Sequence, residues 1–156
     1  MALNPQQKTT LKADILANSD ANALYTVGNL QGLADLYNAL SSPAFIVWKS
    51  AVPKDEVGKA FQASALAAIT AGNNDKLANF AAWNDVVYPA RLDQRQFFDD
   101  VFSVAAGATT RANLLALWKR TATRAEKLFA SGTGSDATPA TLTFEGGLSY
   151  TDFVGL

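Results

Sequence analysis

The sequence contains no cysteine and no histidine among its 156 residues. Disulfides, thiolate nucleophiles, thiolate or imidazole zinc sites and all Ser–His or Cys–His pairs require one of these side chains, so they are excluded. Catalysis would need carboxylates, lysine, tyrosine or a hard metal held by oxygen atoms. No reaction motif of that kind occurs, so we expect no catalytic residues, no cofactor and no resident metal. A metal site assembled from acids distant in the sequence stays open.

Long apolar runs and an excess of one charge are also missing. No run approaches the roughly 20 apolar residues of a membrane span, and the N-terminus lacks the apolar core of a signal peptide. We therefore expect a protein without a membrane span that stays where it is made or assembled. The formal net charge is −1, so no field of the whole protein attracts a polyanion.

Helical patterns dominate what the sequence does contain. Asn4, Pro5 and Gln7 form an N-cap, a first-turn proline and a capping-box partner, which predicts a helix over 5–18. The apolar stripe across 30–40 predicts a second helix. Further helical patterns cover 54–72, 74–88, 90–107 and 109–130. Length and pattern together predict a mainly α, single-domain bundle of about five or six helices.

The last of these helices has the most regular apolar pattern. Its members step by three and four residues, which is typical of a narrow seam against another helix: Leu115, Trp118, Ala122, Ala125 and Phe129. The segment Ser42–Pro53 is ambiguous, because Ser42-Pro43 could begin a helix whereas 45–48 favours a strand. We interpret it as a buried, mostly irregular or short helical crossing.

After residue 130 the pattern changes from helical to alternating. The stretch 131–140 has the composition of a loop. Around Gly146-Gly147 four apolar residues share one face of a predicted β-hairpin with a three-residue loop: Leu142, Phe144, Leu148 and Tyr150. The predicted division is a helical domain over 1–130 and a hinge with a C-terminal arm over 131–156. Because a lone hairpin is marginal in water, it must pack on its own helices or on a neighbouring subunit.

Three other features have weaker functional interpretations. Gly132–Ser135 resembles a phosphate loop but follows a helix and lacks the Lys-Ser/Thr ending. Asp99 and Asp100, near Asp93, point in different directions on a helix and are better explained as a solvated face. The three tryptophans are interpreted as core or interface anchors: Trp48, Trp83 and Trp118.

Basic residues are concentrated between 111 and 127. Arg120, Arg124 and Lys127 are spaced by four and three, so a continuous helix would place them on one face. This face could contact phosphates or an acidic partner, although an ordinary solvated face is the favoured explanation. Nucleic acid is therefore an alternative partner that we do not favour.

Two blocks of the sequence carry a resemblance to known proteins: "SPAFIVWKSAVP" (42–53) and "KRTATRAEKLFASGTGSDATPATLTFEGGLSY" (119–150). Both resemble a family of small proteins of tailed bacteriophages and prophages, which often begin with a helix similar to "LNPQQKTTLKADILA". The resemblance covers a third to a half of the chain and implies a phage context and a virion component made late in infection. It carries over no catalytic residues.

These observations predict a non-enzymatic structural subunit of a tailed-phage virion, assembled in the cytoplasm of the bacterial host. A head-to-tail connector or tail component is favoured, and a capsid-surface protein comes next. Expected partners are other virion proteins and further copies of the chain in a ring or lattice. The predicted assembly interface comprises Trp118, Leu142, Phe144, Leu148 and Tyr150. The alternative is a phage accessory protein that binds nucleic acid or a host protein through the basic face.

Overall fold

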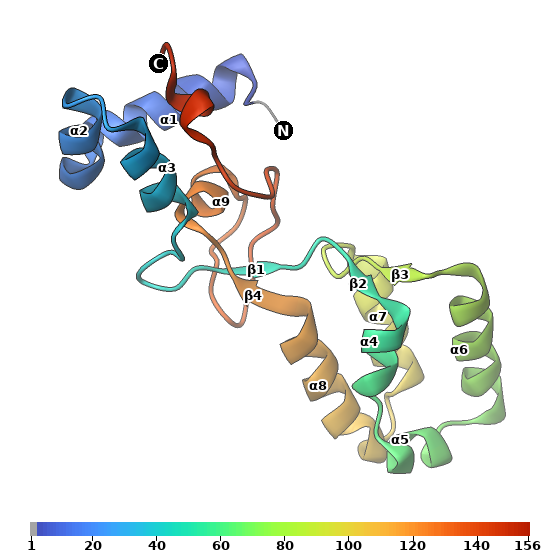
Figure 1. The fold of residues 1–156 in the computed structure, drawn as a ribbon. Coiled ribbons are helices and arrows are strands. Elements are labelled where there is room, and N and C mark those ends of the chain that lie inside the picture. Colours follow the sequence, from blue (N-terminus) through green and yellow to red (C-terminus); the bar gives the residue numbers. More distant parts are fainter. Residues whose placement is uncertain (1–2) are drawn as a thin grey trace. The chain divides into compact units, whose positions relative to one another are not determined.

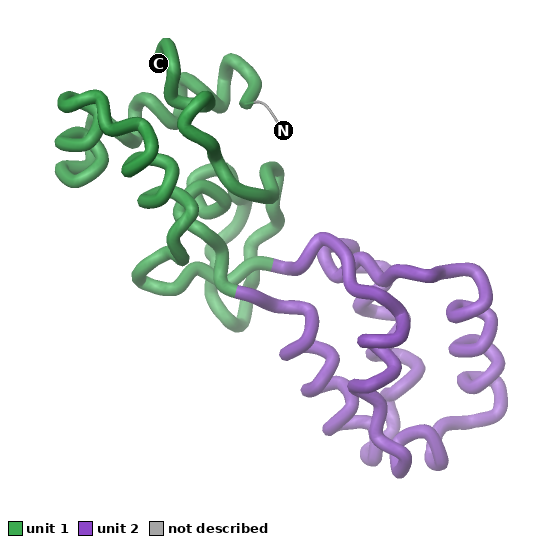
Figure 2. Tube along the Cα trace, in the orientation of Figure 1, with its two compact units in different colours: residues 1–47, 121–156 green, residues 48–120 purple. Residues whose placement is uncertain are grey.

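The computed structural model describes residues 3–156. This part of the chain is mainly helical, as predicted, but it has nine α-helices where five or six were expected, together with two sheets of two strands each (Figure 1). It divides into two compact units (Figure 2). Unit 1 comprises the residues up to Val47 together with Thr121–Leu156, and unit 2 comprises Trp48–Arg120. The predicted domain boundary at residue 130 falls inside unit 1.

The N-terminal part of unit 1 consists of three helices: α1 (Pro5–Ala17), α2 (Ser19–Thr26) and α3 (Leu30–Asn38). An asparagine side chain caps each of them. Asn4 forms the predicted capping box with Gln7, so this local prediction is confirmed. Asn18 and Asn29 accept bonds from the backbone N–H groups three residues later and begin the next two helices.

The core of unit 1 joins these helices to the C-terminal segment. Its largest fully buried side chains are Leu11, Ile15, Leu33, Tyr37 and Phe153. Leu11 and Ile15 are the buried residues of α1. The rings of Tyr37 and Phe153 lie 5.9 Å apart, so residues from opposite ends of the chain complete one core.

The predicted β-hairpin around Gly146-Gly147 is wrong. No strand is found between 141 and 149, and the chain ends in a short 3-10 helix, Tyr150–Phe153. The Asn38 side chain takes the place of a partner strand, because it donates to the carbonyl of Leu148 and accepts from its N–H, both at 2.8 Å. Phe144 and Leu148 are buried in the core of unit 1, so this segment folds back on its own helices.

The predicted continuous helix over 109–130 is also wrong. The chain forms α8 (Ala108–Trp118), then β4 (Lys119–Thr121), and then α9 (Arg124–Phe129). Between α8 and α9 the backbone hydrogen-bonds to residues distant in the sequence instead of continuing the helix. The Ala122 N–H donates to the Phe45 carbonyl, and the Ala122 carbonyl accepts from the Ser41 N–H. The predicted seam is thereby divided, because Trp118 lies in unit 2 and Phe129 in unit 1.

Unit 2 begins at Trp48, the last residue of β1 (Ile46–Trp48), a strand that pairs with β4. Its other elements are β2 (Val52–Pro53), α4 (Lys54–Lys59), α5 (Ala63–Ala68), α6 (Ala71–Trp83), β3 (Val86–Val87), α7 (Leu92–Val101) and α8. β2 and β3 are antiparallel, with Val52 opposite Val87. The predicted helix over 54–72 is interrupted at 60–62, where the Gln62 N–H bonds to the Thr110 hydroxyl at 3.0 Å.

The segment Ser42–Pro53 contributes both β1 and β2, and its other residues are irregular, as predicted. The interpretation as an irregular or helical crossing is therefore wrong for 46–48 and 52–53. The β-branched and aromatic residues of "FIVW" determine the outcome, because they fit an extended backbone that pairs on one edge. Val47 is fully buried in this arrangement.

Candidate functional site

The structure separates the three basic residues that the sequence placed on one helix face. Arg120 lies in β4, at the end of unit 2, whereas Arg124 and Lys127 lie on α9 in unit 1. The helix that would align all three is interrupted between them. Arg124 and Lys127 are one turn apart on α9, so the predicted proximity holds for this pair only.

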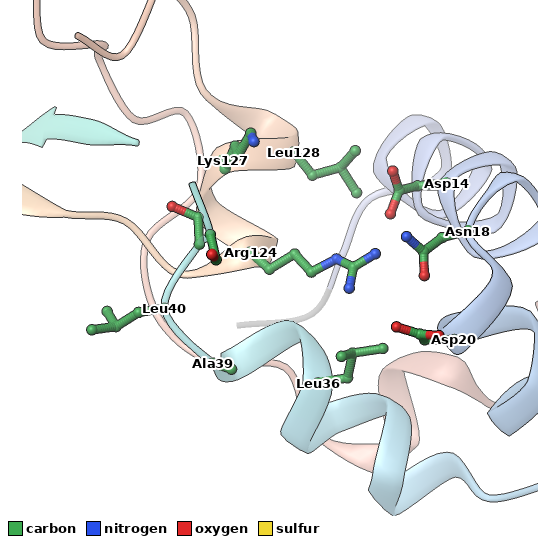
Figure 3. Close-up of a pocket in the computed structure, with 11 residues that line it drawn as sticks. Asp14, Asn18, Asp20, Leu36, Ala39, Leu40, Arg124, Lys127 and Leu128 are labelled. Atoms are coloured by element: carbon green, nitrogen blue, oxygen red, sulfur yellow. The ribbon is translucent and has the colours of Figure 1, made fainter. Parts of the chain in front are cut away.

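Arg124 and Lys127 line a pocket in unit 1 with a volume of about 720 Å³ (Figure 3). Its other lining residues are Asp14, Asn18, Asp20, Leu36, Ala39, Leu40, Ser41, Ser42 and Leu128. The pocket therefore combines two cations from α9, two carboxylates from the α1–α2 region, and three leucines. Opposite charges share one cavity, which makes this surface unlike the uniformly basic face expected from the sequence.

Arg124 occupies the centre of this arrangement. Its side chain extends from α9 toward Asp14, Asn18 and Asp20 (Figure 3). The guanidinium carbon lies 5.2 Å from the centroid of the Tyr37 ring, which is a cation–π distance. Within residues 3–156 this guanidinium makes no hydrogen bond and no ion pair. Its N–H donors are therefore available to a ligand.

Tyr37 fixes the position of one carboxylate. Its buried hydroxyl donates to Asp14 Oδ2 at 2.5 Å. Burial raises the pKa of Tyr37 well above its usual value, the bond to Asp14 and the charge of that carboxylate raise it further, and Arg124 lowers it in part. The hydroxyl thus stays protonated and donates to Asp14 across the physiological range. The other carboxylate oxygen, Asp14 Oδ1, has no bonding partner among the described residues.

The remaining polar groups extend around the pocket. Lys127 is exposed, with its ammonium 5.7 Å from the centroid of the Phe45 ring. Asn18 uses its side-chain oxygen to cap α2, which leaves its amide N–H groups unused within the described chain. Asp20 accepts only a long bond of 3.4 Å from the Ser19 hydroxyl.

The predicted assembly interface divides into buried and exposed members. Trp118, Phe144 and Leu148 are 1%, 2% and 4% exposed, so their own chain covers them. Leu142 is half-buried, and Tyr150 is 54% exposed. Only the last two can contact a neighbour in this conformation.

Trp83 is an exposed aromatic residue that the sequence did not distinguish from the other tryptophans. It ends α6 and is 84% exposed. Leu77 and Phe80 precede it at three-residue spacing and pack against the core of unit 2. That spacing predicts that the three side chains share one face of the helix. The sequence does not show that the core covers this face only as far as Phe80 and leaves Trp83 exposed.

The other sequence motifs have structural explanations. The loop containing Gly132–Ser135 follows α9, and its Thr133 and Ser135 hydroxyls bond to Thr138. Asp93 pairs with Arg91 at 2.6 Å on the surface. Over residues 3–156, no three acidic side chains lie close enough to hold a metal ion together. None of the helices in this described part has the length and apolar character of a membrane span.

Comparisons with protein-family models, with curated proteins and with solved structures found no match to this chain.

Proposed function

We propose that the protein is a non-enzymatic structural subunit of a tailed-phage virion, assembled in the cytoplasm of the bacterial host. A head-to-tail connector or tail component is favoured, and a capsid-surface protein comes next. The resemblance of 42–53 and 119–150 to phage and prophage proteins supports the phage context. Further copies of the chain, in a ring or lattice, and other virion proteins are its partners, with the helices of each unit packed as a small bundle.

The observation that carries the assembly role is the exposure of Trp83. A tryptophan with 84% of its surface in water is unusual, since this residue type is on average among the well-buried ones. Tryptophan is also enriched among the residues that dominate the free energy of protein–protein binding. A neighbouring subunit that covered Trp83 would remove a large apolar surface from water.

Exposed apolar residues of unit 1 provide a surface that Trp83 of another copy could contact. Tyr150 and Val154 are 54% and 55% exposed, and Tyr150 is the last residue of the block that carries the phage resemblance. A contact between Trp83 of one copy and Tyr150 of the next would be heterologous, because two different patches meet. Repeated contacts of this kind generate closed rings when the rotation closes.

Light scattering on the purified protein tests this proposal, with Trp83→Lys as the diagnostic variant. We expect the wild type to form a defined oligomer and the variant to be a folded monomer, because lysine cannot be desolvated at an apolar contact. Val27→Lys is the matched control, since Val27 is 77% exposed in unit 1 and plays no part in the proposed contact. A wild-type protein that stays monomeric and binds no virion component would contradict the proposal.

The polyanion-binding alternative is less well supported. Arg124 and Lys127 share their pocket with Asp14 and Asp20, whose charges oppose the approach of a phosphate backbone. We therefore do not propose nucleic-acid binding for this protein.

A further inference from the structure

We propose that the pocket of unit 1 binds a free α-amino acid with an aliphatic side chain. This inference concerns a site separate from Trp83 and does not depend on the assembly role. It rests on three properties of the pocket: an unpaired cation at its centre, carboxylates without ion-pair partners beside that cation, and apolar side chains around both.

Arg124 is suited to the ligand carboxylate. A guanidinium presents five N–H donors in a planar fork that matches the two oxygens of a carboxylate. None of these donors bonds to a described residue, and the side chain lies within cation–π distance of the Tyr37 ring. The donor group is thus partly preorganised for a bidentate contact, and less side-chain entropy is lost on binding.

Asp14 and Asp20 are suited to the ligand ammonium. Asp14 Oδ2 accepts the bond from the Tyr37 hydroxyl, which orients the carboxylate. Its other oxygen, Oδ1, has no bond to a described residue and can accept one from a ligand. Neither acid forms an ion pair among the described residues. These carboxylates also disfavour a simple anion such as phosphate, because the anion would meet like charges beside the guanidinium.

The relative placement of these charges selects the class of zwitterion. Figure 3 shows the Arg124 guanidinium directed at the group formed by Asp14, Asn18 and Asp20. Arg124 lies 5.2 Å from the Tyr37 ring whose hydroxyl bonds to Asp14, so a group that attracts a carboxylate and one that attracts an ammonium both adjoin Tyr37. An α-amino acid joins its two charges through a single carbon, and so can present both to one pocket.

The apolar lining accounts for the side chain of the ligand. Leu36, Leu40 and Leu128 border the pocket, and Leu40 is 68% exposed without a ligand. An aliphatic side chain would cover part of this surface. The volume of about 720 Å³ lies within the usual range of small-molecule pockets, roughly 300–1,000 Å³, and leaves room for ordered water.

The experiment is an NMR titration of the full-length protein with L-leucine and with three related probes. N-acetyl-leucine lacks the ammonium, leucinamide lacks the carboxylate, and inorganic phosphate tests for a general anion site. We expect L-leucine to shift the backbone amide signals of Asn18, Asp20 and Arg124. Each of the three probes should bind at least about 10-fold more weakly, because a charge-assisted bond typically contributes that factor or more.

Variants tie the binding to the named side chains. Arg124→Gln and Asp20→Asn should each weaken leucine binding about 10-fold or more. Asp20 is exposed, so its substitution keeps the test valid even if the Arg124 variant loses its fold. Lys76→Gln, an exposed site in unit 2, is the matched control and should leave the affinity unchanged. Absence of leucine binding by the wild type, or equal binding of any of the three probes, would overturn the proposal.

Discussion

Gly134 occupies a position where the backbone excludes other residues. Its φ is +66°, in the left-handed region, and an added Cβ would overlap the Phe45 ring. Its carbonyl also accepts a bond of 2.7 Å from the Ile46 N–H, so the loop is held at this point. These contacts explain why a glycine is needed within a loop that otherwise resembles a flexible hinge.

Gly134→Ala should therefore destabilise unit 1 by at least about 1 kcal/mol, the usual cost of left-handed backbone for an L-residue. Denaturant unfolding measures the change. Gly58→Ala is the control, because Gly58 lies within α4 and its added Cβ would meet nothing within 4 Å. That substitution should stabilise by about 0.5–1 kcal/mol, and equal effects of the two would refute the explanation.

Tyr37 links the core of unit 1 to the pocket, and its titration gives a second prediction at this scale. Because burial raises the pKa of the folded hydroxyl, the unfolded chain releases this proton first as the pH rises above about 10. The unfolded state then binds fewer protons than the folded state. The contribution of Tyr37 to the free energy of unfolding therefore falls as the pH rises, by up to about 1.4 kcal/mol per pH unit. Below pH 10 this loss is absent.

Tyr37→Phe removes that contribution and the bond to Asp14. At pH 7 the variant should be about 1–2 kcal/mol less stable than the wild type. The deficit should shrink or reverse at pH 11, which urea unfolding at both pH values would detect. Tyr150→Phe alters an exposed ring and should not change stability at pH 7. A deficit of Tyr37→Phe that grows at pH 11 would show that the sign is wrong.

At the scale of elements, the sequence predicted those helix boundaries that depend on contacts between residues close together in the chain. The start of α1 could be predicted because Asn4, Pro5 and Gln7 act within one turn. The interruption between α8 and α9 could not, since Ala122 bonds to Ser41 and Phe45, about 80 residues earlier in the chain. The prediction of one continuous helix overlooked a signal for the start of α9, the capping box of Thr123 and Glu126.

The predictions for the C-terminal segment and for the basic face failed for the same reason. Alternating apolar residues predicted a hairpin, but the bonding partner of Leu148 is the Asn38 side chain on α3. The sequence placed Arg124 and Lys127 together, yet it could not show that Asp14 and Asp20 line the same pocket. Contacts across more than 100 residues leave no periodic signal in a single sequence.

Asn38→Ala tests how the C-terminal segment is held. The variant leaves the N–H and the carbonyl of Leu148 without their partner, so unit 1 should lose about 2 kcal/mol. Hydrogen exchange at the Leu148 amide should accelerate accordingly. Asn79→Ala is the matched control on α6, where the side chain is exposed, and should change stability by less than about 0.5 kcal/mol. Unchanged protection of the Leu148 amide would contradict this role of Asn38.

At the scale of the whole molecule, unit 1 is formed by two separate segments of the chain, so we expect it to depend on the C-terminal one. A chain that ends at Ala130 lacks Phe144, Leu148 and Phe153, which belong to the core of unit 1. Loss of a single buried phenylalanine typically costs about 3–5 kcal/mol, so unit 1 should unfold. Unit 2 is continuous from Trp48 to Arg120 and should retain its protection against hydrogen exchange. Full protection of α1 and α3 in the truncated chain would contradict the account.

The central claim, that the protein is a structural subunit of a phage particle, is tested most directly on the particles themselves. Tailed particles produced by a host that carries this sequence can be purified on a density gradient and quantified by mass spectrometry. We predict that the chain remains with the particles, after a high-salt wash, at a fixed copy number relative to the other virion proteins. A chain found only in the free protein fraction of the lysate would contradict the claim.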